Sequence, residues 1–146
     1  MEDVLNVAAY ISQRYFSEYS EQIDKMKLHE LMYFAQREAL IQTGEPLFDA
    51  TFYGYKYGFV LKEILDTTLA TPKDFTRDCS SILNEVFASY AKKDSWSLSR
   101  LARGETSWKN SRLSENTDNL ISLEDIRKDA ERMKSRIQML KKLGFI

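Results

Sequence analysis

The sequence has few of the residues that most often build catalytic or metal sites. It has one cysteine, Cys79, and one histidine, His29, in 146 residues. One cysteine cannot form an intramolecular disulfide, and one residue of each kind cannot complete the common zinc ligand sets. A Cys–His nucleophilic pair would need a third group to orient it, and the two residues belong to different expected elements. We therefore expect no disulfide, no metal and no cofactor.

The sequence also lacks long apolar runs and a dominant charge. No apolar stretch approaches the roughly 20 residues that cross a bilayer, and the formal net charge is −1. The first residues, 1–3, include two acids, whereas a secretion signal begins with basic residues. We expect a cytoplasmic protein without a membrane segment. Near-neutral charge also argues against broad binding to nucleic-acid backbones.

Motifs of enzyme chemistry are missing as well. The sequence has no glycine-rich phosphate cradle, no serine elbow and no metal-ligand spacing. We therefore expect a protein that is not an enzyme. The alternative is a site of carboxylates gathered from distant helices, because such a site leaves no local pattern.

The composition of the chain predicts one globular domain over residues 1–146. Hydrophobic residues make up 43% and charged residues 29% of the chain, as in ordinary folded domains. The fold class we expect is mainly α, a compact bundle of about six helices with a short β-like aromatic segment after the second helix. Apolar residues spaced by three and four predict helices over residues 3–19, 24–44, 60–69, 82–92, 95–104 and 122–144. Residues 105–109 are expected to form an irregular corner, and residues 110–117 a loop.

The second expected helix and the turn after it supply the predicted core. Its apolar face is wide, so we expect this helix to be covered on more than one side and to be central to the bundle. Tyr33, Phe34 and Phe48 are assigned to the core. Gly44 is placed to end the helix, because glycine readily adopts a left-handed conformation, and Pro46 prevents it from resuming.

An aromatic segment follows, with three tyrosines at alternate positions. If the segment is extended, Tyr53, Tyr55 and Tyr57 lie on one face of a short strand or hairpin. One interpretation packs these rings on the domain's own helices. The other makes them a surface for a protein partner, because tyrosine suits interfaces that are partly apolar and partly wet.

The last expected helix repeats apolar residues at heptad spacing and is basic. This spacing fits packing along a near-parallel helix, and we favour a neighbour within the domain over a homodimer through this C-terminal helix. Residues 122–146 hold seven bases and four acids, whereas residues 1–30 hold six acids and three bases. The basic residues Lys128, Arg132 and Arg136 support a secondary hypothesis of DNA binding, which we rank below a solvated helix face.

Three blocks of the sequence resemble one family of domains. Residues 27–36, KLHELMYFAQ, are similar to the "KLQKLLYFAQ" helix of the Panacea domain, the SocA-like antitoxin domain also found in GepA-like phage-associated proteins. Residues 45–49, EPLFD, resemble its "xPLFD" turn, and residues 55–60, YKYGFV, its "WKYGPV" segment. Residues 98–112 resemble its "LSxLTHxExPWxxAR" corner through Trp108 and Arg112.

The sequence departs from this family at several positions. Tyr55 and Phe59 stand where the family has tryptophan and proline, and Ala102 and Arg103 stand where it has a Thr-His pair. Ser107 replaces the proline before the tryptophan. A role of the Thr-His pair therefore does not carry over to this chain.

The resemblance implies an antitoxin of phage or mobile-element origin. Such a domain neutralises a cognate toxin by direct protein–protein binding, and the toxin gene is usually adjacent. The alternatives are a DNA-binding autoregulator and an adaptor that delivers a partner to a protease. The residues we predict to contact the partner are Tyr53, Tyr55, Tyr57, Phe59, Trp108 and Arg112.

Overall fold

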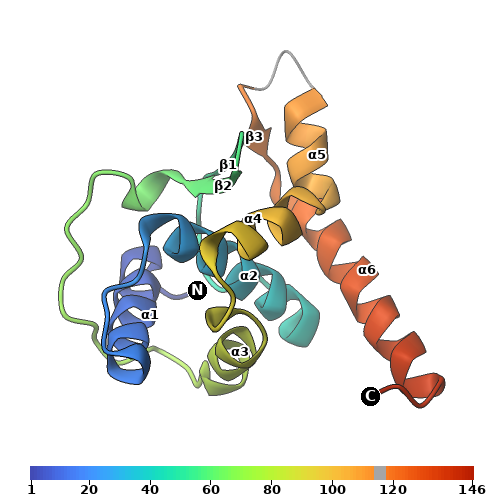
Figure 1. Cartoon of the computed structure of the whole chain (residues 1–146), viewed down its shortest axis with the longest axis horizontal. Coiled ribbons are helices and arrows are strands. Elements are labelled where there is room, and N and C mark those ends of the chain that lie inside the picture. The colour runs from blue at the N-terminus through green and yellow to red at the C-terminus, as the bar shows by residue number, and fades with distance from the viewer. Residues whose placement is uncertain (114–117) are drawn as a thin grey trace.

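The computed structural model describes residues 1–113 and 118–146 and shows a mainly helical protein with a small sheet (Figure 1). Its α-helices are α1 (Val4–Tyr19), α2 (Lys25–Thr43), α3 (Ser80–Val86), α4 (Ser95–Arg103), α5 (Thr106–Leu113) and α6 (Leu123–Lys142). Its strands are β1 (Phe52–Tyr55), β2 (Gly58–Leu61) and β3 (Leu120–Ile121), which form an antiparallel sheet in the order β2-β1-β3. The predicted fold class is confirmed.

Helix α2 is the centre of the fold, as its sequence predicted. Its described contacts include α1, α3, α4, α6 and β2, and Tyr33 and Phe34 on it and Phe48 after it are at most 1% exposed. Asp24 accepts the Lys27 amide at its start, and Gly44 ends it with a φ of 77°.

Polar side chains buried on α2 bind the backbone of the segments around it. Lys27 Nζ donates to the Ala91 carbonyl at 3.1 Å. Gln36 donates to the Phe48 carbonyl at 2.8 Å and accepts the Leu47 amide at 2.9 Å. Because a buried polar group without a partner is costly, the Gln36 bonds fix where the irregular turn 44–51 lies on the helix, and the Lys27 bond fixes the end of the π turn at Ala91.

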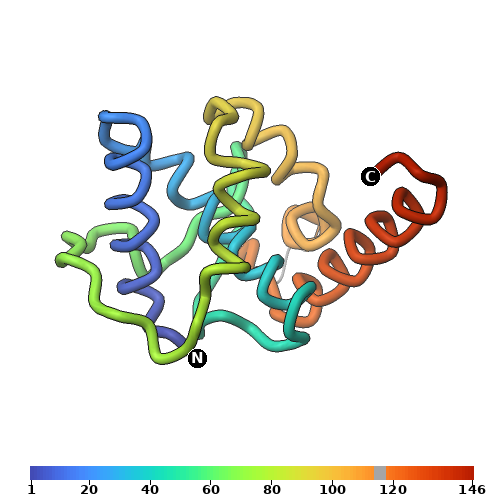
Figure 2. The backbone as a smooth tube through the Cα atoms, turned by 90° about the horizontal axis from the view of Figure 1, so that it is seen from below, coloured from blue at the N-terminus to red at the C-terminus, as the bar shows by residue number. Residues whose placement is uncertain are grey.

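The termini of the other long helices also follow their sequence signals. Asp3 accepts the Leu5 amide at the start of α1, and Ser122 accepts the Asp125 amide at the start of α6. Both are side-chain caps of orphan N–H groups. Helix α6 packs on α2 and α5 within the protein, and its C-terminal end extends beyond the other helices (Figures 1 and 2).

Three predictions of local structure are wrong. Residues 60–69 are not a helix, because Val60 and Leu61 pair with β1 and only a 3₁₀ turn, Lys62–Ile64, follows. Residues 105–109 are not an irregular corner, because α5 begins at Thr106 and holds Trp108 against the hairpin. Residues 110–113 belong to α5, and residues 114–117 of the predicted loop lie outside the described part of the chain.

The fourth expected helix is present but changes its winding. Helix α3 continues into a π-helical turn, Phe87–Ala91. π-Helical turns are frequent at functional sites. Here the turn carries Tyr90, whose ring stacks on Phe34 with 4.0 Å between centroids.

Candidate binding surface

The β1–β2 hairpin is held at its turn by side chains from two helices. Trp108 Nε1, on α5, donates to the carbonyls of Tyr55 at 2.9 Å and Gly58 at 3.1 Å. Ser99 Oγ, on α4, donates to the Tyr57 carbonyl at 2.5 Å. The turn carbonyls would otherwise depend on solvent, so these bonds give the hairpin tip one fixed position.

Two glycines let the helices approach the hairpin. A side chain at Gly54 would overlap Ser111 and crowd Trp108 on α5, and one at Gly58 would overlap the Glu30 carboxyl on α2. Gly58 also has a φ of 140°, which disfavours other residues. In the segment FYGYKYG, residues 52–58, the two glycines are therefore the positions where helices approach the backbone, and the aromatic residues lie before and between them.

The tip of the hairpin presents aromatic rings to solvent. Tyr55 and Tyr57 are each 45% exposed, and Trp96 at the start of α4 is 54% exposed. Tyr57 meets Trp96 edge to face with 5.3 Å between centroids, and Tyr55 stacks with the half-buried Tyr53 at 6.1 Å. Adjoining large aromatics that are partly exposed and backed by a fixed scaffold are typical of protein-binding surfaces.

The structure does not place the six predicted contact residues on one surface. Tyr53 and Tyr55 share the outer face of β1, as predicted, whereas Tyr57 lies in the turn and reaches the Trp96 ring instead. Trp108 is half-buried and, with Arg112, positions the hairpin: Arg112 Nη1 donates to the Gly54 carbonyl at 3.2 Å. The side chains available for contact are therefore the tyrosines, with Arg112 at their edge.

The prediction that Phe59 lies on the contact surface is wrong. It is 2% exposed, and its ring stacks on Tyr33 with 3.7 Å between centroids and an interplanar angle of 6°. Its amide donates to Glu30 Oε1 at 3.0 Å. Phe59 is thus a core residue that fastens β2 to α2.

Trp96 is the surface residue that the prediction missed. The apolar face of α4 is formed by Leu98 and Ala102, which are fully buried. Trp96 lies two residues before Leu98, which is about 200° around the helix and outside that face. The helical spacing of α4 therefore predicts that the Trp96 side chain points away from the core.

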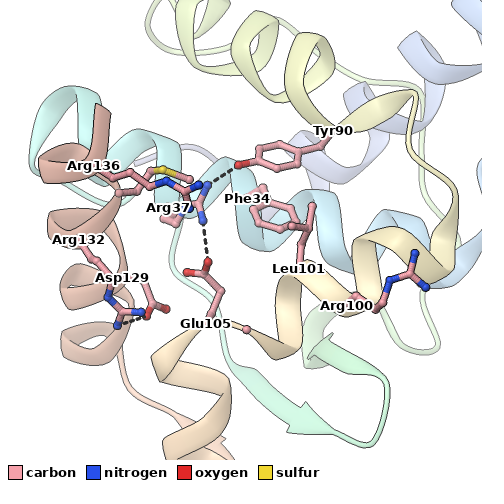
Figure 3. A pocket seen from close by; sticks show the side chains of 11 residues that line it. Phe34, Arg37, Tyr90, Arg100, Leu101, Glu105, Asp129, Arg132 and Arg136 are labelled. Atoms are coloured by element: carbon pink, nitrogen blue, oxygen red, sulfur yellow. Dashed lines mark hydrogen bonds and ion pairs between the residues drawn. The ribbon is translucent and has the colours of Figure 1, made fainter. Parts of the chain in front are cut away.

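A second feature is a pocket with both charged and apolar lining where α2, α4 and α6 meet (Figure 3). It has a volume of about 280 Å³ and is lined by apolar, acidic and arginine side chains. Arg37 donates to Glu105 at 2.9 Å and to the Tyr90 hydroxyl at 2.5 Å. The Tyr33 hydroxyl lies 2.7 Å from both Glu105 and Asp129, and so links α2 to α6.

Burial sets the electrostatics of this pocket and of the hairpin. Burial, with the charges of Glu105 and Asp129, raises the pKa of Tyr33 far above its usual value, so its hydroxyl stays protonated. Burial would lower the pKa of Arg37, but Tyr90, Tyr33 and Glu105 outweigh that effect and raise it. Burial raises the pKa of Glu30, against the opposing effects of the Phe59 amide and Arg103.

The single histidine and the single cysteine have structural surroundings. His29 Nδ1 accepts the Leu61 amide at 2.9 Å, and burial lowers the pKa of this imidazole. It is therefore a neutral acceptor that holds the end of β2. Cys79 is a buried free thiol before α3, and among the described residues no group of three His, Cys, Asp or Glu side chains is placed to hold a metal.

Comparisons with known proteins give one match. The family model described as "Antitoxin SocA-like, Panacea domain" matches residues 28–109. This segment runs from α2 to the Trp108 region of α5 and includes the hairpin and α4. No curated protein and no solved structure matches the chain. In the described part, no helix combines the length and apolar character needed to cross a membrane.

Proposed function

The chain belongs to the SocA-like antitoxin, Panacea domain family, and we propose on this premise that it neutralises a cognate toxin by binding that protein directly. The toxin is encoded by a neighbouring gene, in a toxin–antitoxin or phage-associated system. The family match over residues 28–109 is the observation that carries this proposal.

The aromatic hairpin tip is the surface that we assign to the toxin. Tyr55, Tyr57 and Trp96 are the large aromatic side chains exposed there, and all three lie within the matched segment. Aromatic residues contribute much of the binding energy when a partner covers them. Because Trp108 and Ser99 already hold the turn, little conformational freedom is lost when the toxin binds.

We propose that this neutralisation involves no catalysis by the antitoxin. The polar groups that would be candidates for chemistry hold the fold together instead. Glu30 accepts the Phe59 amide, His29 accepts the Leu61 amide and Asp129 accepts the Ser107 amide. Such bonds support a binding scaffold, and catalytic turnover of a toxin substrate is not needed for inhibition.

The test is co-expression with each adjacent open reading frame. We expect one product that stops growth alone, is harmless with this protein and co-purifies with it. Tyr55→Ala combined with Trp96→Ala should weaken the complex by roughly 100-fold or more, as for aromatic hot spots, and should restore toxicity. Phe16→Ala is the control, because Phe16 is also an exposed aromatic, 59% exposed, but lies on α1.

Two results would contradict the proposal at different levels. If no neighbouring product is toxic or bound, the antitoxin function fails. If a toxin is neutralised equally well by the Tyr55→Ala, Trp96→Ala protein, the function stands and the assigned surface is wrong.

A further inference from the structure

The pocket between α2, α4 and α6 is large enough to receive side chains of a partner protein. Its volume of about 280 Å³ falls below the range of about 300–1,000 Å³ common for small-molecule sites. Phe34, Leu101 and Met133 give it an apolar lining, and Leu101 is 42% exposed. An apolar side chain from another protein fits this lining.

The charged residues around this pocket leave cations in excess. Arg37, Arg100, Arg132 and Arg136 line it together with two acids, Glu105 and Asp129. Both acids already accept from the protein's own groups, namely Arg37, the Tyr33 hydroxyl and the Ser107 amide.

The arginines of the pocket differ in how far they are already paired. Arg37 is 4% exposed and donates to Glu105 and to the Tyr90 hydroxyl, so it adds positive charge at the base of the pocket but no accessible donor. Arg136 makes no ion pair within the described chain, and it lines the same pocket as Arg37. The pocket therefore offers positive charge to an incoming anionic group.

Further bases follow along α6 beyond the pocket. At about 100° per residue, Arg132, Arg136 and Met139 share the side of the helix that faces the pocket, whereas Lys134 and Lys141 lie on the other side. From residue 132 to residue 142 the helix has five bases and no acid: Arg132, Lys134, Arg136, Lys141 and Lys142. Met139, in the same stretch, is 62% exposed. The C-terminal end of α6 extends beyond the other helices in Figures 1 and 2. We call residues 132–142 the basic arm.

The combination of apolar and basic side chains identifies the kind of partner. DNA would use the cations but would leave the apolar lining of the pocket and Met139 uncovered. A second copy docked arm to arm would bring two basic arms together, and like charges repel. An acidic protein segment that also carries apolar side chains satisfies both features.

We propose that the basic arm and the arginine pocket form a docking surface for an acidic, apolar-bearing segment of a protein partner. This surface is separate from the aromatic hairpin tip, and the inference does not require that the partner be the toxin. Acidic side chains bind the arginines and lysines, and an apolar side chain enters the pocket beside Leu101 and Met133.

The test uses fluorescently labelled synthetic peptides and the whole protein. One peptide is amphipathic and built from leucine and glutamate, and the matched peptide has glutamine in place of glutamate. We expect the acidic peptide to bind at least roughly tenfold more tightly than the neutral one. Its affinity should fall between about 0.01 M and about 1 M ionic strength, because the screening length falls from about 30 Å to about 3 Å.

Matched variants separate this surface from general charge effects. Arg132→Glu with Arg136→Glu, at two arginines of the basic arm that also line the pocket, should weaken binding of the acidic peptide by roughly tenfold or more. Lys25→Glu with Lys62→Glu makes the same number of charge reversals at exposed lysines of α2 and of the turn after β2 and should leave binding unchanged. Leu101→Trp fills the pocket at unchanged charge and should also weaken binding.

Each contrary outcome overturns the proposal. It is wrong if the acidic peptide does not bind, or if the arm variant and the control variant bind it equally. Circular dichroism and an unchanged unfolding midpoint exclude misfolding of a variant. A DNA duplex or a vesicle rich in phosphatidylserine that binds the arm more tightly than the peptide would assign the surface to nucleic acid or to a membrane instead.

Discussion

Phe34 shows how much of the fold depends on a single side chain. It is 1% exposed, its ring stacks on Tyr90 and meets Tyr33 edge to face at 5.2 Å, and the Arg37 guanidinium lies 5.0 Å from its centre. Phe34→Ala would leave a cavity where α2 meets the π turn. It would also remove the stacking surface that orients Tyr90 toward Arg37.

We expect Phe34→Ala to lower the free energy of unfolding by about 3–5 kcal/mol, the usual cost of truncating a buried phenylalanine. The measurement is urea denaturation followed by circular dichroism. Phe16→Ala, at a side chain 59% exposed on α1, should change that free energy by less than about 0.5 kcal/mol. An unchanged midpoint for Phe34→Ala would remove this residue from the core.

At the scale of elements, local signals predicted the long helices and failed where distant contacts decide the structure. Helices α1, α2 and α6 begin at side-chain caps that can be read from the sequence. Residues 60–64 are apolar enough for a helix, but pairing with β1 and the bond from Leu61 to His29 make Val60 and Leu61 a strand. His29 is 32 residues away, and β1 pairs across a tight turn whose position the apolar pattern does not show, so helical periodicity alone could not reveal the strand.

The same reasoning explains which contact residues could be predicted. Alternation correctly placed Tyr53 and Tyr55 on one face, because β1 is extended. Alternation failed at Tyr57 and Phe59, because the chain reverses at residues 56–57. Tyr57 therefore lies in the turn, and Phe59 belongs to β2, whose side chains alternate independently of those of β1. The position of this turn depends on Gly58 and on the Trp108 and Ser99 side chains, which come from other elements.

The hairpin itself can be tested at Gly58. Gly58→Ala would strain a residue with a φ of 140° and would press a methyl group into the Glu30 carboxyl. Gly44→Ala is a matched control, because Gly44 also has a positive φ, 77°, but has nothing within 4 Å of the added carbon.

We expect the control to cost about 1–2 kcal/mol from backbone strain and Gly58→Ala to cost about 1–3 kcal/mol more from overpacking. Thermal unfolding with calorimetry gives both values. Amide exchange should also speed up at Phe59, whose N–H donates to Glu30. Equal costs for the two variants would show that α2 does not constrain the hairpin.

At the scale of the whole molecule, two acids on the central helix, the buried Glu30 and the half-buried Glu38, make the stability depend on pH. Burial and the nearby charge of Glu85 raise the pKa of Glu38 to about 7, against the opposing effects of Arg37 and Gln42. Burial also raises the pKa of Glu30 well above its usual value. Both residues lie on α2, so their ionisation acts on the helix that the rest of the fold surrounds.

The direction of the pH effect follows from the raised pKa values. Below pH of about 4.5, Glu38 is protonated in both the folded and the unfolded chain. Between that pH and about 7, the unfolded chain releases the proton while the folded protein keeps it. The free energy of unfolding therefore falls as pH rises through this window and levels off above it, so far as Glu38 is concerned.

Glu38→Gln should remove this part of the pH dependence. We expect the variant to gain stability relative to the wild-type protein as pH rises from about 5 to about 8, because glutamine carries no proton to lose. Urea denaturation at a series of pH values measures the difference. Glu131→Gln, at an exposed position of α6, is the control and should give a curve parallel to that of the wild type. If the Glu38→Gln curve is parallel as well, the Glu38 carboxyl ionises in the folded protein as it does in the unfolded chain, and the pH dependence arises at Glu30 or elsewhere.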